Sequence, residues 1–232
     1  MSRLFGLIGF PLTHSFSKGY FAEKFANLGI EEVAYENFPI SSIQEFPKLW
    51  ESHPNLEGIN ITIPYKKEVI PFLYHQSRVV SAIGACNCIR NIDGALFGYN
   101  TDVIGFEKSL LPHLKPHHNK ALILGTGGAA AAVAYVLESL HIHFQWVSRK
   151  TTPTTIAYHD LSREVIATHP LIINTSPVGM YPNVNEAPSI PYDAITSSHH
   201  LYDLIYNPIM TSFLQQGAAH GATTQNGLEM LH

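Results

Sequence analysis

A glycine-rich turn between an apolar run and a helical stretch has the residue types and spacing for phosphate binding. After ALIL, residues 125 to 130 read Gly-Thr-Gly-Gly-Ala-Ala, which fits G-x-G-x-x-A, and an alanine-rich stretch follows to Leu140. Glycines let the backbone approach a pyrophosphate closely, and a helix N-terminus offers unpaired N–H groups and a partial positive charge. The pattern predicts a dinucleotide-binding turn made by Gly125, Thr126, Gly127, Gly128 and Ala129. A plain strand-to-helix turn that needs a positive φ is the alternative.

The residues after the next apolar run, FQWV, indicate which dinucleotide would bind. In an NAD site an acidic residue after this strand binds the ribose 2′-hydroxyl, but here Ser148, Arg149 and Lys150 follow. The planar guanidinium of Arg149 can stack on adenine and pair with a 2′-phosphate, and Lys150 adds a point charge. The sequence therefore predicts NADP as cofactor, and an ordinary basic surface turn is the alternative.

The hydrophobic pattern predicts the elements that hold these residues. In the first part, strand-like runs (LFGLIG, VAYENF, GINITI) alternate with helical stretches (KGYFAEKFANLG, SSIQEFPKLWESH, KKEVIPFLY). An Asp-Gly turn at residues 93 and 94 predicts a hairpin. A second series from ALILG to ATTQN, with apolar strand cores, predicts a parallel sheet covered on both faces. We expect an α/β chain with a domain boundary near residues 102 to 119.

The composition is that of a compact globular protein, with 45% hydrophobic and 14% charged residues. A formal charge of −4 gives no excess of positive charge that would favour binding to nucleic acid or an anionic membrane. Cys86 and Cys88 are placed too close along one strand for an ordinary disulfide, which indicates a reducing compartment. Because we find neither a membrane-spanning run nor a signal peptide, we expect the cytoplasm. The scattered histidines predict no metal site.

Eight motifs occur in an order that resembles the shikimate dehydrogenase family over essentially the whole chain. They are GFPLTHSFS (Gly9 to Ser17), NITIPYK (Asn60 to Lys66), IGACN (Ile83 to Asn87), GYNTD (Gly98 to Asp102), GTGGAA (Gly125 to Ala130), NTSPVGM (Asn174 to Met180), DLIYNP (Asp203 to Pro208) and NGLEML (Asn226 to Leu231). The resemblance implies an N-terminal α/β substrate domain with a mainly parallel sheet over residues 1–102. It also implies a Rossmann-like NADP-binding domain over residues 103–225, with residues 226–232 returning to the first domain.

The resemblance also implies a reaction, the reversible reduction of 3-dehydroshikimate to shikimate by NADPH on the way to chorismate and the aromatic amino acids. The roles that it implies are as follows: Ser15 and Ser17 hold the substrate carboxylate, Thr62 and Asn87 its hydroxyls, Lys66 and Asp102 the reacting oxygen, Tyr206 meets the carboxylate end, Leu204 and Gly227 line the nicotinamide pocket, and Thr175 and Ser176 border the cofactor cleft.

The residue types suit this chemistry. Hydride transfer to a ketone places negative charge on oxygen, so a proton donor must lie within hydrogen-bond reach; Lys66 is the candidate, and Asp102 would orient its ammonium group. Which of the two dominates proton transfer is left open. Lys66, beside Lys67 at an expected helix start, could instead be a solvated lysine, and Ser15 or Ser17 could cap a helix that begins near Lys18.

Two departures from the family pattern leave rival functions open. Lys18 stands where the family usually has proline, and the chain ends at NGLEMLH where family members continue with a substrate-binding glutamine and a helix that returns to the first domain. We therefore expect weaker shikimate binding than in a longer relative. The rivals are a quinate or quinate/shikimate dehydrogenase that uses NAD, and a non-catalytic dinucleotide-binding module. A homodimer is compatible with the sequence, which leaves the oligomeric state undetermined.

Overall fold

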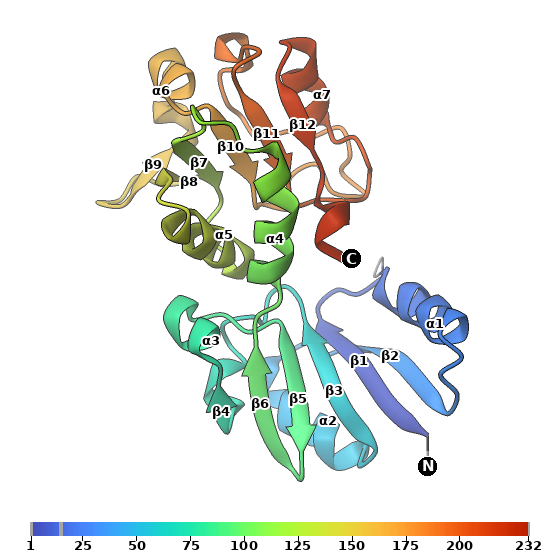
Figure 1. The fold of residues 1–232 in the computed structure, drawn as a ribbon. Helices are drawn as coiled ribbons and strands as arrows, with labels where there is room; N and C mark the ends of the chain where they lie inside the picture. The colour runs from blue at the N-terminus through green and yellow to red at the C-terminus, as the bar shows by residue number, and fades with distance from the viewer. Residues whose placement is uncertain (1, 14–15, 232) are drawn as a thin grey trace. The chain divides into compact units, whose positions relative to one another are not determined.

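The computed structural model describes residues 2–13 and 16–231 and divides the chain into two compact units, residues 1–101 and 102–232 (Figure 1). Within the described residues, each unit is built on a six-stranded sheet. The α/β class with two domains is confirmed. The division falls between Thr101 and Asp102, one residue before the predicted boundary.

The first unit contains a mixed sheet. Its strands are β1 (Arg3–Gly9), β2 (Val33–Pro39), β3 (Leu56–Ile61), β4 (His75–Gln76), β5 (Cys88–Ile92) and β6 (Ala95–Tyr99). They lie in the order β2-β1-β3-β5-β6-β4; β1 is parallel to β2 and β3, whereas β5 is antiparallel to β3 and β6. Its helices are α1 (Ser17–Asn27), α2 (Phe46–Ser52) and α3 (Arg78–Ile83), with short 3-10 turns η1 (Ile43–Glu45) and η2 (Ile70–Phe72).

The turn between β5 and β6 confirms the predicted hairpin. Asp93 and Gly94 both have positive φ, 52° and 84°, and Gly94 N–H donates to Asn91 Oδ1 at 2.9 Å. Positive φ at both central residues matches the right-handed twist of the strands that the turn joins.

One predicted helix is wrong. Residues 63–69 form successive turns, and only Ile70–Phe72 is helical, as the 3-10 turn η2. Pro71 has no N–H to donate and cannot lie inside an α-helix without breaking it. Val69, in the same segment, is fully buried in the core of the first unit.

The second unit contains the parallel sheet expected from its apolar strand runs. Its strands are β7 (Lys120–Leu124), β8 (His143–Ser148), β9 (Thr155–Ala157), β10 (Leu171–Asn174), β11 (His200–Asp203) and β12 (Thr223–Gln225), in the order β12-β11-β10-β7-β8-β9. Its helices are α4 (Asp102–Leu110), α5 (Gly128–Ser139), α6 (Arg163–Thr168) and α7 (Ser212–Ala219), with short turns η3 (Leu111–His113), η4 (Tyr158–Asp160), η5 (Tyr192–Ala194) and η6 (Gly227–Leu231).

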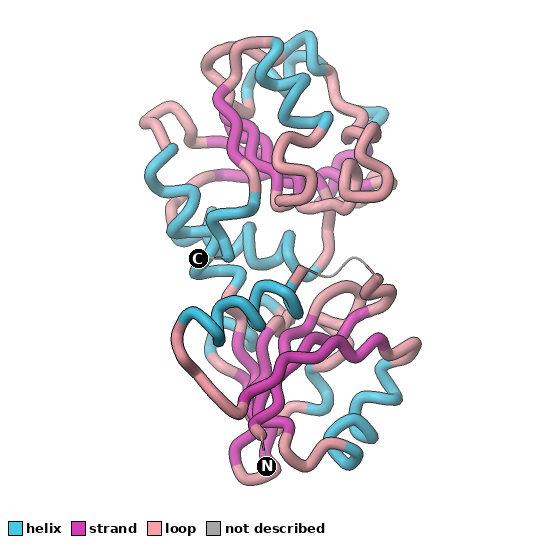
Figure 2. The backbone as a smooth tube through the Cα atoms, turned by 90° about the vertical axis from the view of Figure 1, so that its right-hand side faces the viewer, coloured by secondary structure: helices cyan, strands magenta, loops and turns pink. Residues whose placement is uncertain are grey.

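Helices cover both faces of this second sheet (Figure 2). Leu201 of β11 packs in one cluster with Ile166 of α6 and Phe213 of α7. The next residue, Tyr202, points to the opposite face, where its ring meets Phe106 of α4 at 5.1 Å between centroids. Burial on both faces explains why these strands are apolar at successive positions.

The last described residues belong to the second unit. Turn η6 packs against α4, and a side chain at Gly105 of α4 would lie 2.8 Å from the carbonyl oxygen of Met230. Residues 226–231 are counted with the second unit, and His232 lies outside the described residues; the return of this segment to the first domain stays a prediction. In residues 2–13 and 16–231, no helix is both long and apolar enough to cross a membrane.

A histidine cluster in the second unit links its stability to pH. His200 on β11 is fully buried, and its ring stacks on His113 at 5.6 Å and on His118 at 6.0 Å between centroids. Burial, together with the charge that His113 and His118 would carry, lowers the pKa of His200 to about 4, against the opposing effect of Gln225.

We expect acid to weaken the fold through His200. The unfolded chain protonates this histidine below about pH 6.5, whereas the folded protein keeps it neutral down to about pH 4. The contribution of His200 to the free energy of unfolding should therefore be fully present above about pH 6.5 and fall by about 3 kcal/mol towards pH 4. Urea unfolding across this range checks it, because His200→Leu should lose about that much less stability than the wild type as the pH falls.

The exposed His159 provides the matched control, because His159→Leu should leave the slope unchanged. Buried Asp203, whose pKa is raised to about 6, gives the opposite slope, stabilising the fold as the pH falls through that value. The quantity that tests the prediction is therefore the difference in pH dependence of the free energy of unfolding between the wild type and the variant. Equal slopes in wild type and His200→Leu would contradict the prediction.

Candidate functional site

The glycine turn joins β7 to α5 and leaves the start of the helix open. Gly125 has φ +118°, a conformation that other residues rarely adopt, and Gly127 occupies the N-cap position of α5. Among the described residues no side chain caps α5, and Thr126 and Gly127 are exposed. The unpaired N–H groups of the first helical turn can therefore receive an anion.

Thr175, in the loop after β10, packs directly on this turn. Its hydroxyl donates to the carbonyl oxygen of Leu124 at 2.8 Å, and a Cβ atom at Gly125 would lie 2.7 Å from the same hydroxyl. A glycine is therefore required at position 125 for two reasons: a side chain would clash with Thr175, and the backbone φ is positive. At Gly127, in contrast, a Cβ atom would meet nothing within 4 Å, so open space lies where the predicted pyrophosphate would bind.

The basic turn lies at the same edge of the sheet. Leu124 of β7 pairs in register with Val147 of β8 on one side and with Asn174 of β10 on the other. Ser148 therefore ends its strand beside the glycine turn, and its hydroxyl donates to the carbonyl oxygen of Lys150 at 2.7 Å. This hydrogen bond and the one from Lys150 N–H to Ser148 Oγ, 3.2 Å, shape a tight turn with Arg149 and Lys150 exposed.

Leu204 and Gly227 also lie together. Gly227 N–H donates to the carbonyl oxygen of Ile205 at 3.2 Å, and a side chain at Gly227 would collide with the carbonyl oxygen of Leu204. Tyr206 is half-buried, and burial raises the pKa of its phenol. The open glycine turn, the two cations and this edge of strand ends fit a dinucleotide with a 2′-phosphate.

In the first unit, polar side chains gather where β3 ends and β5 begins. Asn87 is buried; its Nδ2 donates to Thr101 Oγ1 at 2.9 Å, and its Oδ1 accepts from Thr101 N–H at 2.8 Å. Thr62 follows β3, and its methyl group fills the space where a side chain at Gly9 would lie. Ser17 is the first residue of α1, whose N-cap position is held by Phe16, so Ser17 is not the cap residue. Ser15 lies outside the described residues.

Two residues that the sequence analysis did not single out connect this cluster. The buried Tyr35 donates its hydroxyl to Asn60 Oδ1 at 2.9 Å, and Asn60 Nδ2 donates to the carbonyl oxygen of Asn87 at 3.4 Å. Burial raises the pKa of Tyr35, and a hydrogen bond with Ser17 opposes the shift. Period two along β3 could have indicated Asn60, two residues before Thr62. No sequence signal marks Tyr35.

The two residues predicted to act at the reacting carbon belong to different units, and each is described within its own. Lys66 is half-buried in the turns after β3, where its carbonyl oxygen accepts from Cys86 N–H at 2.7 Å. The turn is thereby tied to the segment that carries Asn87. Asp102 is the first residue of α4, where a carboxylate interacts favourably with the helix dipole.

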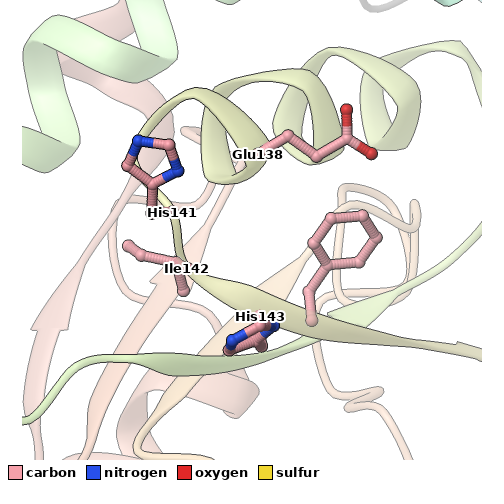
Figure 3. A pocket seen from close by; sticks show the side chains of 5 residues that line it. Glu138, His141, Ile142 and His143 are labelled. Carbon is pink, nitrogen blue, oxygen red and sulfur yellow. The ribbon is translucent and has the colours of Figure 1, made fainter.

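A pocket of about 540 Å³ lies away from these residues, at the end of α5 opposite to the glycine turn (Figure 3). Glu138, His141, Ile142 and His143 line it, and the carboxylate of Glu138 points away from the ring of His141. Residues 2–13 and 16–231 contain no cluster of three or more His, Cys, Asp or Glu suited to a metal ion.

The parallel sheet with a glycine turn at its carboxyl edge defines the class of α/β dinucleotide-binding proteins. The family model of the shikimate dehydrogenase substrate binding domain matches residues 7–89. A shikimate dehydrogenase (NADP(+)) of Carboxydothermus hydrogenoformans is 37% identical over 256 aligned residues, which cover 99% of this chain and 88% of that protein. The chain belongs to the shikimate dehydrogenase family.

Solved structures agree with this assignment. A shikimate 5-dehydrogenase of Thermus thermophilus, in complex with NADP(H) and shikimate, has a TM-score of 0.86 at 30% identity and covers 99% of this chain and 88% of its own. A quinate dehydrogenase of Corynebacterium glutamicum, in complex with NAD, has a TM-score of 0.85 at 26% identity and covers 99% and 89%. The shared fold therefore includes enzymes named for two substrates.

Proposed function

We propose that this chain is an NADP-dependent shikimate dehydrogenase, which reduces 3-dehydroshikimate to shikimate reversibly in the pathway to chorismate and the aromatic amino acids. The observation that carries the proposal is the joint occurrence, at one sheet edge, of the open glycine turn and the exposed pair Arg149 and Lys150. An NAD enzyme would more naturally carry an acidic residue after β8. Family membership supplies the substrate class.

The proposed cofactor site follows the carboxyl edge of the second sheet. Gly125, Thr126, Gly127, Gly128 and Ala129 would receive the pyrophosphate, and Ser148, Arg149 and Lys150 the 2′-phosphate. At the nicotinamide end we place Leu204 and Gly227, while Thr175 borders the cofactor cleft beside the glycine turn. The packing of Thr175 on Gly125 and of Gly227 on Leu204 supports this order.

The proposed substrate residues offer short polar groups with little side-chain entropy to lose. Ser15 and Ser17 would bind the carboxylate, Thr62 and Asn87 the hydroxyls, and Tyr206 would meet the carboxylate end. Two hydrogen bonds, one donated to Thr101 and one accepted from it, hold the Asn87 amide in one orientation, which supports a fixed hydrogen-bonding role.

In the proposed reaction Lys66 donates a proton to the oxygen on which charge develops. Bound NADPH supplies the hydride. Asp102 favours the charged ammonium group of Lys66 and accepts a hydrogen bond from a substrate hydroxyl. In the reverse direction the same pair takes up the proton. A cytoplasmic location and a homodimer stay predictions from the sequence.

Absorbance at the NAD(P)H band tests the function, with shikimate or quinate each offered with NADP or NAD. We expect shikimate with NADP to give the highest kcat/KM. Turnover of quinate with NAD alone would favour the second dehydrogenase assignment, and no turnover with any pair would favour the non-catalytic module.

Arg149→Ala tests the cofactor assignment within the same assay. A hydrogen-bonded charge pair contributes about 1.5–3 kcal/mol, so the variant should raise the Kd of NADPH about 10- to 100-fold and that of NADH much less, since NADH loses only the stacking on adenine. Arg163→Ala is the matched control, because Arg163 is an exposed arginine of the same unit that pairs with Asp193. An equal loss for NADPH and NADH would contradict the role of Arg149.

A further inference from the structure

Asp203, the last residue of β11, is a fully buried carboxylic acid beside the proposed cofactor edge. Its carboxyl group receives three hydrogen bonds. Thr211 Oγ1 donates to Oδ2 at 2.6 Å, while Ile205 N–H and Asn174 Nδ2 each donate to Oδ1 at 3.0 Å. Burial raises the pKa of Asp203 to about 6, and the three donors oppose this shift. Removing a carboxylate from water costs free energy, so a buried carboxylate that is surrounded by hydrogen-bond donors is expected to have a structural or functional role.

The bond to Asn174 extends into the loop that packs on the glycine turn. Asn174 is buried, and its Oδ1 accepts from the N–H of Ser176 at 3.1 Å and from the hydroxyl of Ser176 at 2.7 Å. Asp203 accepts a hydrogen bond from Asn174 Nδ2, and Ser176 donates to Asn174 Oδ1. Only one of the two orientations of the amide allows both interactions. Thr175, between them, is thereby held against Gly125.

The other two bonds extend into the segments at the proposed nicotinamide end. Ile205, whose N–H is bound by Asp203, accepts from Gly227 N–H at 3.2 Å through its carbonyl oxygen. Thr211 is the N-cap residue of α7, where its hydroxyl also accepts from Leu214 N–H at 3.4 Å. The carboxylate of Asp203 therefore closes the loop of residues 204–211 at both ends.

We infer that Asp203 is a positioning residue for cofactor binding: its carboxylate holds the segments that carry Thr175, Leu204 and Gly227 in one arrangement. This inference rests on the proposed function, and every contact that supports it lies within the second unit. Asp203 would not touch the cofactor. It acts through Asn174 and Ile205, which donate to its carboxylate, and it reaches the segment of Gly227 through the carbonyl oxygen of Ile205.

Asp203→Asn tests the inference with nearly the same shape. An amide nitrogen at this place would face donors, and a buried donor without an acceptor is penalised by about 1–3 kcal/mol, so we expect the Kd of NADP, measured by calorimetric titration, to rise about tenfold. At saturating NADP the KM for shikimate should rise much less than the Kd of NADP, because Tyr206 is the one proposed substrate residue in the loop that Asp203 closes, and the others lie in the first unit. A general structural defect would instead raise the Kd of NADP and the KM for shikimate together.

Tyr202→Phe is the matched control. Tyr202 is the preceding residue of β11, is fully buried, and its hydroxyl lies 2.7 Å from Ser109 Oγ on the opposite face of the sheet. The variant loses one buried hydrogen bond and none of the Asp203 contacts, so NADP binding should stay at the wild-type level.

A second pair of variants keeps the test decisive if Asp203→Asn does not fold. Thr211→Val removes one donor to the carboxylate, and Thr211→Ser retains it. We expect weaker NADP binding in the first and wild-type binding in the second. Equal Kd values in this pair, or an unchanged Kd in folded Asp203→Asn, would overturn the inference alone. A wild-type chain that does not bind NADP would overturn the proposed function and the inference with it.

Discussion

Lys66→Ala is expected to lower kcat for shikimate oxidation by about 10²- to 10⁴-fold, the range that a positioned general acid or base contributes. The KM values should change much less, because the proposed role of Lys66 lies in the transition state rather than in ground-state binding. Steady-state kinetics at saturating shikimate and NADP measure this effect.

Lys67→Ala is the matched control, since Lys67 is the neighbouring residue, is exposed, and has no proposed role. It should keep wild-type turnover. Asp102→Asn, measured beside Lys66→Ala, shows which member of the pair dominates proton transfer, because the larger fall in kcat identifies it. Near-native turnover in Lys66→Ala would remove Lys66 from the proposed mechanism.

Gly127→Ala is expected to raise the Kd of NADP about 10- to 100-fold with little effect on folding, because a methyl group forced into an occupied space typically costs about 1–3 kcal/mol. The apo protein has room for this methyl group, since a Cβ atom at Gly127 would meet nothing within 4 Å. Only the proposed pyrophosphate would collide with it. Calorimetric titration gives the Kd, and thermal unfolding tests the fold.

Gly125→Ala would be a poorer test, because its φ of +118° and the nearby Thr175 hydroxyl would disturb the fold and the ligand site together. Gly19→Ala serves as the control. Gly19 lies in α1 of the first unit, and a Cβ atom there also meets nothing within 4 Å. NADP binding should be unchanged in this variant. If Gly127→Ala bound NADP as tightly as wild type, the glycine turn would not be the pyrophosphate site.

Local signals in the sequence predicted much of the fold and the cofactor edge. The Asp93-Gly94 hairpin and the turn at Gly125 were both recognised, because each depends on a backbone conformation that few residue types adopt. The predicted helix over KKEVIPFLY failed, since its apolar spacing matched a helix while Pro71, which lacks an N–H, breaks an α-helix.

The order of motifs along the chain was sufficient to determine the family, the class of cofactor and the candidates Lys66 and Asp102, because these depend on residue identity at short spacing. The tertiary fold alone decided that Tyr35 supports Asn60 and that Asp203 joins Asn174, Ile205 and Thr211. Asn174 and Asp203 are 29 positions apart in the chain. Contacts over such separations arise from strand order and burial, which local residue patterns do not encode.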